Sequence, residues 1–293
     1  MSSLTRPEGT LAQDLHVSRR NLAALIAAGY AAIAVGADAA PITTRADGLT
    51  IDSAVLPGGL PAFVARPAGS GRHPAVIIVN EVFGLHEYIR DICRRLAHLG
   101  YVAIAPEFFH RNDPGRSLAA TMDFKVISAI VSEAKNDQVM GDVGTAIAWL
   151  EKQPFVDRRR LGITGFCWGG AVVWMAAAKF PQLKAGVAWY GRLAPPSPGD
   201  PVTDVRKYPL EIAGDLKAPV LGLYGGLDKG IPLADVDAMR AALKAAGKSG
   251  SDIIVYPAAE HGFHADYRPS YNAAAATDGW ARLLAHFKAN GVV

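Results

Sequence analysis

The sequence predicts an α/β fold: a mostly parallel sheet with helices on both faces and an antiparallel edge at its N-terminal end. Along most of the chain, short continuous apolar runs alternate with helical segments, the pattern of a parallel sheet covered on both faces. Before them, two strand-like runs, 49–55 and 60–65, flank Pro57-Gly58-Gly59 and predict an antiparallel hairpin. We find no internal repeat and expect one domain over residues 40–293.

The expected elements follow one another in order after the hairpin. A buried strand over 74–79 leads to a helix over 87–99, which is expected to end at Gly100 because glycine readily takes the left-handed conformation there. The final helix shows a buried stripe at helical spacing, formed by Trp280, Leu283, Leu284 and Phe287. The other expected elements are strands over 101–105, 161–164, 185–189, 220–224 and 253–256, and helices over 122–135, 142–152, 171–179 and 235–246.

The composition excludes several classes of protein. Half of the 293 residues are hydrophobic and 19% are charged, a globular balance that excludes a disordered chain. The net charge is only +3 and no five basic residues are consecutive, so no nucleic-acid partner is expected. The only cysteines are Cys93 and Cys167, which excludes a disulfide scaffold and a four-cysteine zinc site.

The N-terminal residues 1–39 are expected to be an export signal. Arg19 and Arg20 precede an uncharged stretch over 22–37, and Ala37-Asp38-Ala39 places small residues where a signal peptidase cuts. The adjacent arginines resemble a twin-arginine signal and predict a periplasmic or secreted protein. The alternative is a terminal helix of a cytoplasmic protein. The stretch is too short and too weakly apolar for a membrane span, so permanent membrane insertion is not expected.

The candidate nucleophile is Cys167, in Gly165-Phe166-Cys167-Trp168-Gly169-Gly170 between the strand over 161–164 and a helix. This G-x-C-x-G pattern is a nucleophile elbow with cysteine in place of serine, and its glycines allow the close backbone approach of a tight turn. Such a turn lifts the sulfur clear of the sheet and aims a helix N-terminus at it. The alternative is an inert, buried structural cysteine.

The candidate acid and base also lie at strand ends. Asp228 follows the strand over 220–224 in a glycine-rich loop, and His261 follows the strand over 253–256. Nucleophile, acid and histidine then occur in the chain order of a triad on this kind of sheet. His264 is the rival base, and His261 is preferred because Gly262 beside it permits close approach. A turn-forming aspartate and a surface histidine are the alternatives for these residues.

A fourth candidate, Glu81, lies in Asn80-Glu81-Val82-Phe83-Gly84 after the strand over 74–79. This loop is placed to supply one oxyanion-hole amide, and the residue after the nucleophile, Trp168, supplies the other. A carboxyl group beside a thiol is able to hold that thiol neutral until a substrate displaces it. The alternative is a glutamate that faces solvent.

Together these motifs resemble the dienelactone hydrolase (carboxymethylenebutenolidase) family over residues 49–291, with the Glu81 loop plus the cysteine elbow as the specific part. The resemblance implies an α/β-hydrolase fold without metal or organic cofactor. It also implies a triad of Cys167, His261 and Asp228, with Glu81 controlling the thiol. The amides of Val82 and Trp168 would then form the oxyanion hole, and Tyr190, in Trp189-Tyr190-Gly191, would line the pocket.

The implied activity is hydrolysis of a small ester or lactone through a thioester acyl-enzyme. The best-known members bind a substrate carboxylate through arginines, but no arginine lies between Arg116 and Arg158 and the fourth residue after His261 is Ala265. Arg268 is a candidate substrate-binding cation, and the expected substrate is a small ester or lactone rather than dienelactone specifically. The proline-rich insert 194–215 and the segment 106–120 are expected to cap the pocket.

Two other functions fit the same residues. One is a non-catalytic binding protein that kept the elbow for structural reasons. The other is a hydrolase of a different acyl bond, such as a thioester or a peptide. The sequence does not indicate an oligomeric state.

Overall fold

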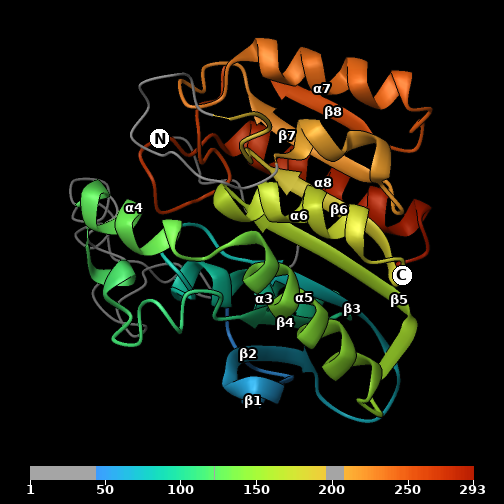
Figure 1. The fold of residues 1–293 in the computed structure, drawn as a ribbon. Helices are drawn as coiled ribbons and strands as arrows, with labels where there is room; N and C mark the ends of the chain where they lie inside the picture. Colours follow the sequence, from blue (N-terminus) through green and yellow to red (C-terminus); the bar gives the residue numbers. More distant parts are fainter. Residues whose placement is uncertain (1–43, 122, 196–207) are drawn as a thin grey trace, which may run out of the picture.

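An eight-stranded sheet organises the part of the chain that the structure describes, with strand order β1-β2-β4-β3-β5-β6-β7-β8 (Figure 1). The structure is a computed structural model that describes residues 44–121, 123–195 and 208–293. The expected signal over 1–39 and most of the 194–215 insert lie outside these residues. The strands are β1 (Leu49–Leu56), β2 (Leu60–Pro67), β3 (His73–Val79), β4 (Val102–Pro106), β5 (Val156–Phe166), β6 (Leu183–Trp189), β7 (Val220–Gly225) and β8 (Asp252–Tyr256).

The strand pairing confirms the predicted sheet. β1 pairs with β2 and β2 with β4 in antiparallel register, which makes the antiparallel N-terminal edge. Every other neighbouring pair, from β4 and β3 through to β7 and β8, is parallel. The central strand β3 has no solvent-exposed surface from Ala75 to Val79, because apolar side chains point to both covered faces.

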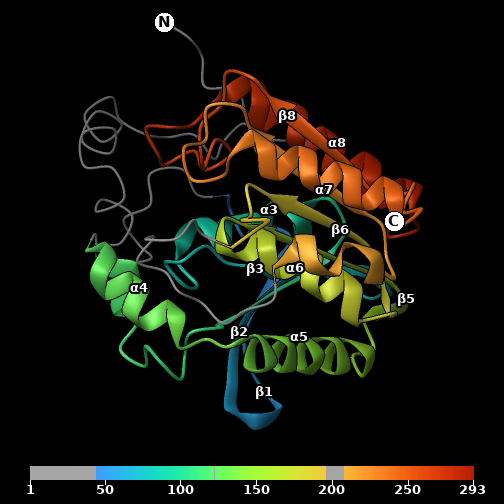
Figure 2. The ribbon, with the colours of Figure 1, turned by 45° about the horizontal axis from the view of Figure 1, so that its top comes forward.

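Helices cover both faces of the sheet. They are α3 (Glu87–His98), α4 (Phe124–Ser132), α5 (Asn136–Glu151), α6 (Trp168–Lys179), α7 (Leu233–Ala245) and α8 (Ala273–Ala289), with short 3-10 turns η3 (Pro57–Gly59), η4 (Ser117–Ala120) and η5 (Pro209–Asp215). From β3 the chain passes to β4 on one side of β3, and from β4 it returns to β5 on the other side. Because both connections are right-handed crossovers that run in opposite directions, α3 lies on the face opposite α5, α6 and α7. Figure 2 shows α5 and α6 on one side of the sheet and α3 behind it. Among the described residues, no helix is both long and apolar enough to cross a membrane.

Some expected boundaries differ from the structure. The strand predicted over 161–164 is longer, because β5 begins at Val156 and continues through Asp157 and three arginines whose polar side chains hid its start. The helix predicted over 142–152 begins at Asn136, and the helix predicted over 122–135 is described as α4, Phe124–Ser132. The helix after the elbow begins at Trp168 rather than at residue 171, since its glycines pack tightly instead of breaking it.

Helix α4 stands apart from the sheet in both Figure 1 and Figure 2. It lies in the connection between β4 and α5, near the edge where parallel strands β3, β5, β6, β7 and β8 end. Sheets of this kind bind ligands at the carboxyl ends of their strands. The fold therefore places α4 where it can border a site.

Candidate active site

Cys167 occupies the tight turn between β5 and α6. Its backbone has φ of 55° and ψ of −118°, a strained conformation for a residue with a side chain. The turn is possible because its neighbours lack side chains: a Cβ on Gly165 would lie 2.4 Å from the carbonyl oxygen of Gly169. A Cβ on Gly169 would in turn lie 2.4 Å from the carbonyl oxygen of Val79. The elbow predicted from the glycine pattern is thus present in the structure.

The surroundings of Cys167 hold it at the N-terminus of α6. Its amide donates to the carbonyl oxygen of Trp189 at the end of β6, at 3.0 Å. The side chain is half-buried and is a free thiol, as is that of the fully buried Cys93 on α3. The sulfur therefore lies at the end of α6 that carries partial positive charge.

His261 and Asp228 meet at the ends of β8 and β7. Nδ1 of His261 lies 2.7 Å from Oδ2 of Asp228, whose carboxylate is fully buried. Burial alone lowers the pKa of His261, but a charge interaction with Cys167 and hydrogen bonds with Asp228 and Cys167 outweigh it and raise the pKa well above its usual value. Cys167, His261 and Asp228 thus lie at the ends of neighbouring elements and line one pocket.

Glu81 lies in a buried polar cluster behind this group. The hydroxyl of Tyr267 donates to its Oε2 at 2.5 Å, and Nη2 of Arg268 lies 2.7 Å from its Oε1. Nε2 of His86 lies 3.4 Å from Oε2. Burial, with the nearby Glu81 charge, raises the pKa of Tyr267 well above its usual value, so its hydroxyl stays protonated and remains a donor.

Arg268 has a different position from the one expected of a substrate-binding residue. Its side chain is 3% exposed, ion-paired with Glu81, and does not line the pocket. Burial lowers its pKa to about 9. Gly262 makes room for it, since a Cβ there would lie 2.3 Å from Nη1 of Arg268. The cation that was expected to bind substrate instead neutralises the Glu81 carboxylate.

Tyr190 lines the pocket, whereas His264 lies in the core. Tyr190 lies with its ring edge toward His261, at 5.2 Å between ring centroids. His264 is fully buried, stacked on Trp280, and its Nδ1 lies 2.6 Å from the hydroxyl of Tyr88. Burial lowers the pKa of His264 well below its usual value, so it is a neutral residue of the core.

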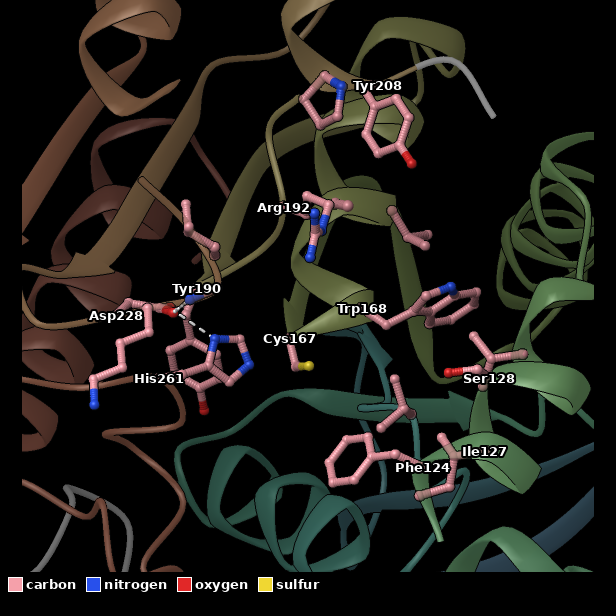
Figure 3. A pocket seen from close by; sticks show the side chains of 18 of the residues that line it. Phe124, Ile127, Ser128, Cys167, Trp168, Tyr190, Arg192, Tyr208, Asp228 and His261 are labelled. Carbon is pink, nitrogen blue, oxygen red and sulfur yellow. Dashed lines mark hydrogen bonds and ion pairs between the residues drawn. The ribbon is translucent and has the colours of Figure 1, made fainter. Parts of the chain in front are cut away.

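A pocket of about 580 Å³ opens in front of these residues (Figure 3). Cys167, Asp228, His261, Val82 and Trp168 all line it, so the structure brings together the predicted triad and both predicted oxyanion-hole residues. The segment 106–120 contributes indirectly, because Phe108 and Phe109 pack against the ring of Trp168.

The pocket also has a lining that the sequence did not reveal. Arg192 and Lys229 add two cations, and one face of α4 adds Phe124, Ile127, Ser128, Val131 and Ser132. Arg192 lies two residues after Tyr190 at the end of β6, so a search of strand ends for cations would have found it. In the described residues, no group of three or more His, Cys, Asp or Glu side chains is placed to hold a metal ion.

Comparisons with known proteins agree with this geometry. The model of the dienelactone hydrolase family matches residues 60–291. A protein of Methylorubrum extorquens, provisionally assigned as a carboxymethylenebutenolidase, is 47% identical over 288 residues, covering 97% of this chain and 97% of the relative. A protein of Escherichia coli K12 with the same provisional assignment is 50% identical over 233 residues, covering 79% of this chain and 83% of the relative.

Solved structures show the same relationship. The crystal structure of a Klebsiella pneumoniae protein, provisionally assigned as a dienelactone hydrolase, superposes with a TM-score of 0.74 at 46% identity, covering 82% of this chain and 98% of that chain. A dienelactone hydrolase-like promiscuous phosphotriesterase from metagenomic libraries shares the fold, with a TM-score of 0.67 at 23% identity over 83% of this chain and 99% of that one. The chain thus belongs to the dienelactone hydrolase family and is a carboxylic ester hydrolase of the carboxymethylenebutenolidase type.

Proposed function

We propose that the chain hydrolyses small esters or lactones through a triad of Cys167, His261 and Asp228 and a thioester acyl-enzyme. The observation that carries this proposal is the 2.7 Å contact between His261 Nδ1 and Asp228 Oδ2 beside a cysteine held in a strained elbow. Asp228 orients the imidazole so that Nε2 is available to the sulfur, the role of the third member of a triad.

The proposed reaction has two steps. Cys167 transfers its proton to His261, and the raised pKa of His261 supports a thiolate–imidazolium pair. The thiolate attacks the carbonyl carbon, the C–O bond breaks, and the imidazolium protonates the leaving oxygen. In the second step His261 takes a proton from water, the resulting hydroxide attacks the thioester, and the C–S bond breaks to release the acid and restore the thiolate–imidazolium pair.

The amides of Val82 and Trp168 are proposed to bind the oxyanion. Both residues line the pocket beside Cys167, and Trp168 is the first residue of α6, the end at which a helix carries partial positive charge. One such donor contributes roughly 3 kcal/mol of transition-state stabilisation in acyl-transfer enzymes.

We also propose that Glu81 acts on the thiol only after its present partners release it. The support is its pairing with Arg268 and Tyr267, which satisfies the carboxylate away from Cys167. Cys167 is then left to pair with His261 in the substrate-free protein.

The test of this function is hydrolysis of p-nitrophenyl acetate by the wild type and Cys167→Ala. We expect the variant to lose activity by at least about 10³-fold, since the nucleophile is removed. Cys93→Ala is the matched control, because it removes the other thiol from a helix outside the pocket. Mass spectrometry should detect the trapped acetyl group on Cys167. Equal rates in wild type and Cys167→Ala would refute the mechanism.

A separate proposal concerns residues 1–39, which we propose are removed during export. The paired arginines, the uncharged stretch and the Ala37-Asp38-Ala39 site support it. N-terminal sequencing of protein recovered from the periplasm should begin at Ala40, and recovery of the intact N-terminus in the cytoplasm alone would refute it.

A further inference from the structure

We infer that the pocket contains an apolar acyl-group subsite between α4 and α6, so that the enzyme favours esters and lactones whose acyl part carries a sizeable apolar group. This inference rests on the proposed function and names the substrate class of the same site. Four features of the described residues support it.

The first feature is the face that α4 turns to the pocket. Phe124, Ile127 and Val131 line it at positions i, i+3 and i+7, a spacing that places them on one side of a helix. Val126 lies outside the pocket on the same helix and is 41% exposed. Ile127 and Val131 are also part of the hydrophobic core, at 2% and 8% exposure, so the core holds α4 in place while its apolar stripe borders the cavity.

The second feature is a matching face on α6. Trp168, Ala171, Val172 and Met175 line the pocket at positions i, i+3, i+4 and i+7. Trp168 leads directly from Cys167, so this apolar face begins at the reacting sulfur. A group bound along it is continuous with an acyl group attached to Cys167.

The third feature is the direction that the chemistry requires. The leaving oxygen receives its proton from His261, so the leaving group lies on the side of His261 and the acyl group extends away from it. Figure 3 shows His261 on one side of Cys167, with Trp168, Ser128 and Ile127 on the other. The acyl group is thereby directed into the space between α6 and α4.

The fourth feature is size and exposure. At about 30 Å³ for each water-sized group, the cavity of about 580 Å³ holds on the order of twenty such groups, well beyond a single lactone ring. Phe124, at the rim, is 61% exposed. An apolar acyl group would remove the Phe124 side chain from water, which is a favourable contribution to binding.

The test is the dependence of kcat/KM on acyl length for p-nitrophenyl acetate, butyrate, hexanoate and octanoate, all below their micellar concentrations. We expect kcat/KM to rise about two- to fourfold for each methylene that the subsite buries. A flat profile, or a decline beyond acetate in an enzyme that hydrolyses acetate, would overturn the inference.

Two matched pairs of variants locate the effect. Phe124→Ser should lower the octanoate-to-acetate ratio of kcat/KM about tenfold, whereas Val126→Ser, an exposed apolar change on the same helix, should leave the ratio unchanged. Ser128→Asp, which places a charge on the pocket face of α4, should lower the ratio further than Ala129→Asp on its exposed face. Equal ratios within both pairs would show that α4 does not contact the acyl group.

Failure of the proposed function gives a different result. If no ester of any length is hydrolysed, or if Cys167→Ala is as active as wild type, the triad mechanism fails. The subsite is then judged by calorimetric titration of octanamide into Cys167→Ala. Saturable binding that Phe124→Ser weakens and Val126→Ser does not would support the subsite, and absence of binding would overturn it.

Discussion

Glu81 and Arg268 form an ion pair of 2.7 Å in which the two side chains are 0% and 3% exposed. Water cannot replace either partner, so loss of one leaves the other charge buried without compensation. This relationship joins the loop after β3 to the loop after β8, the two segments that carry Val82 and His261. The pair therefore ties one wall of the active site to another.

We expect Glu81→Gln to lower the free energy of unfolding by about 3–5 kcal/mol, because it leaves the Arg268 guanidinium buried beside a neutral amide. Urea unfolding followed by circular dichroism measures the loss. Glu151→Gln, at an exposed position of α5, is the control and should be within about 0.5 kcal/mol of wild type. Adding Arg268→Met to Glu81→Gln should recover part of the loss, and a Glu81→Gln loss below about 1 kcal/mol would contradict the buried pair.

The titration of His261 should reflect its partners. Its imidazole is expected to titrate above the usual value near 6.5, and at a lower pH in Cys167→Ala, where the main interaction that raises the pKa is absent. Because the pKa of His261 is raised in the folded state, protonated His261 contributes to the free energy of unfolding. This contribution is fully present below about pH 6.5 and is lost as the pH rises through the folded-state pKa. The difference in free energy of unfolding between wild type and His261→Gln should therefore decrease as the pH rises from about 6.5 to the folded-state pKa of His261. NMR titration of the ring proton measures the pKa, and identical values in wild type and Cys167→Ala would refute the coupling.

Asp228→Asn should reduce kcat by about 10²- to 10⁴-fold with the fold intact. An amide in place of the buried carboxylate no longer stabilises the imidazolium, and its NH₂ group favours the wrong tautomer of His261. Steady-state kinetics with p-nitrophenyl acetate gives kcat. Asp235→Asn, at a half-buried position of α7 outside the pocket, supplies the control, and an unaltered kcat in Asp228→Asn would remove Asp228 from the triad.

Gly165→Ala should destroy the elbow. Its Cβ would lie 2.4 Å from the Gly169 carbonyl oxygen, and neither backbone segment can move without displacing Cys167. We expect activity to fall at least about 100-fold and stability to fall by about 3 kcal/mol. Gly141→Ala, in an exposed and open position of α5, should instead keep activity and add up to about 1 kcal/mol. Thermal melts and esterase rates on both proteins decide between these outcomes.

Arg192 should set the preference for substrates that carry a carboxylate. We expect Arg192→Gln to lower kcat/KM for p-nitrophenyl hydrogen succinate about tenfold relative to p-nitrophenyl butyrate, because a charge-assisted hydrogen bond is lost. Lys125→Gln, which removes an equal charge from an exposed position of α4 outside the pocket, controls for long-range electrostatics. An equal change in both variants would mean that Arg192 acts only through net charge.

The fold and the three triad candidates were predictable because their signals are local. The glycines around Cys167 are required by backbone approaches within a few residues, and the strand-end rule places Asp228 and His261 without knowledge of side-chain packing. The pairing of Glu81 with Tyr267 was not predictable, since these residues are 186 positions apart and only the folded sheet brings them together.

The role of α4 was hidden for another reason. The sequence predicted a helix over 122–135, but that prediction does not say whether an apolar side of the helix faces a core or a cavity. Arg268 shows the same limit, because its charge suggested a ligand while its actual partner is a buried glutamate. For both α4 and Arg268, the sequence does not reveal which part of the folded protein the side chains contact.

The separation of α4 from the sheet has a consequence for how substrate range can diverge within this family. Residues such as Phe124 border the pocket without being part of the buried core, so replacing them costs little folding energy. The reacting groups, by contrast, rest on strand ends and crowded glycines that tolerate almost no exchange. A chimaera that received this helix from a relative would inherit the relative's selectivity while keeping its own chemistry.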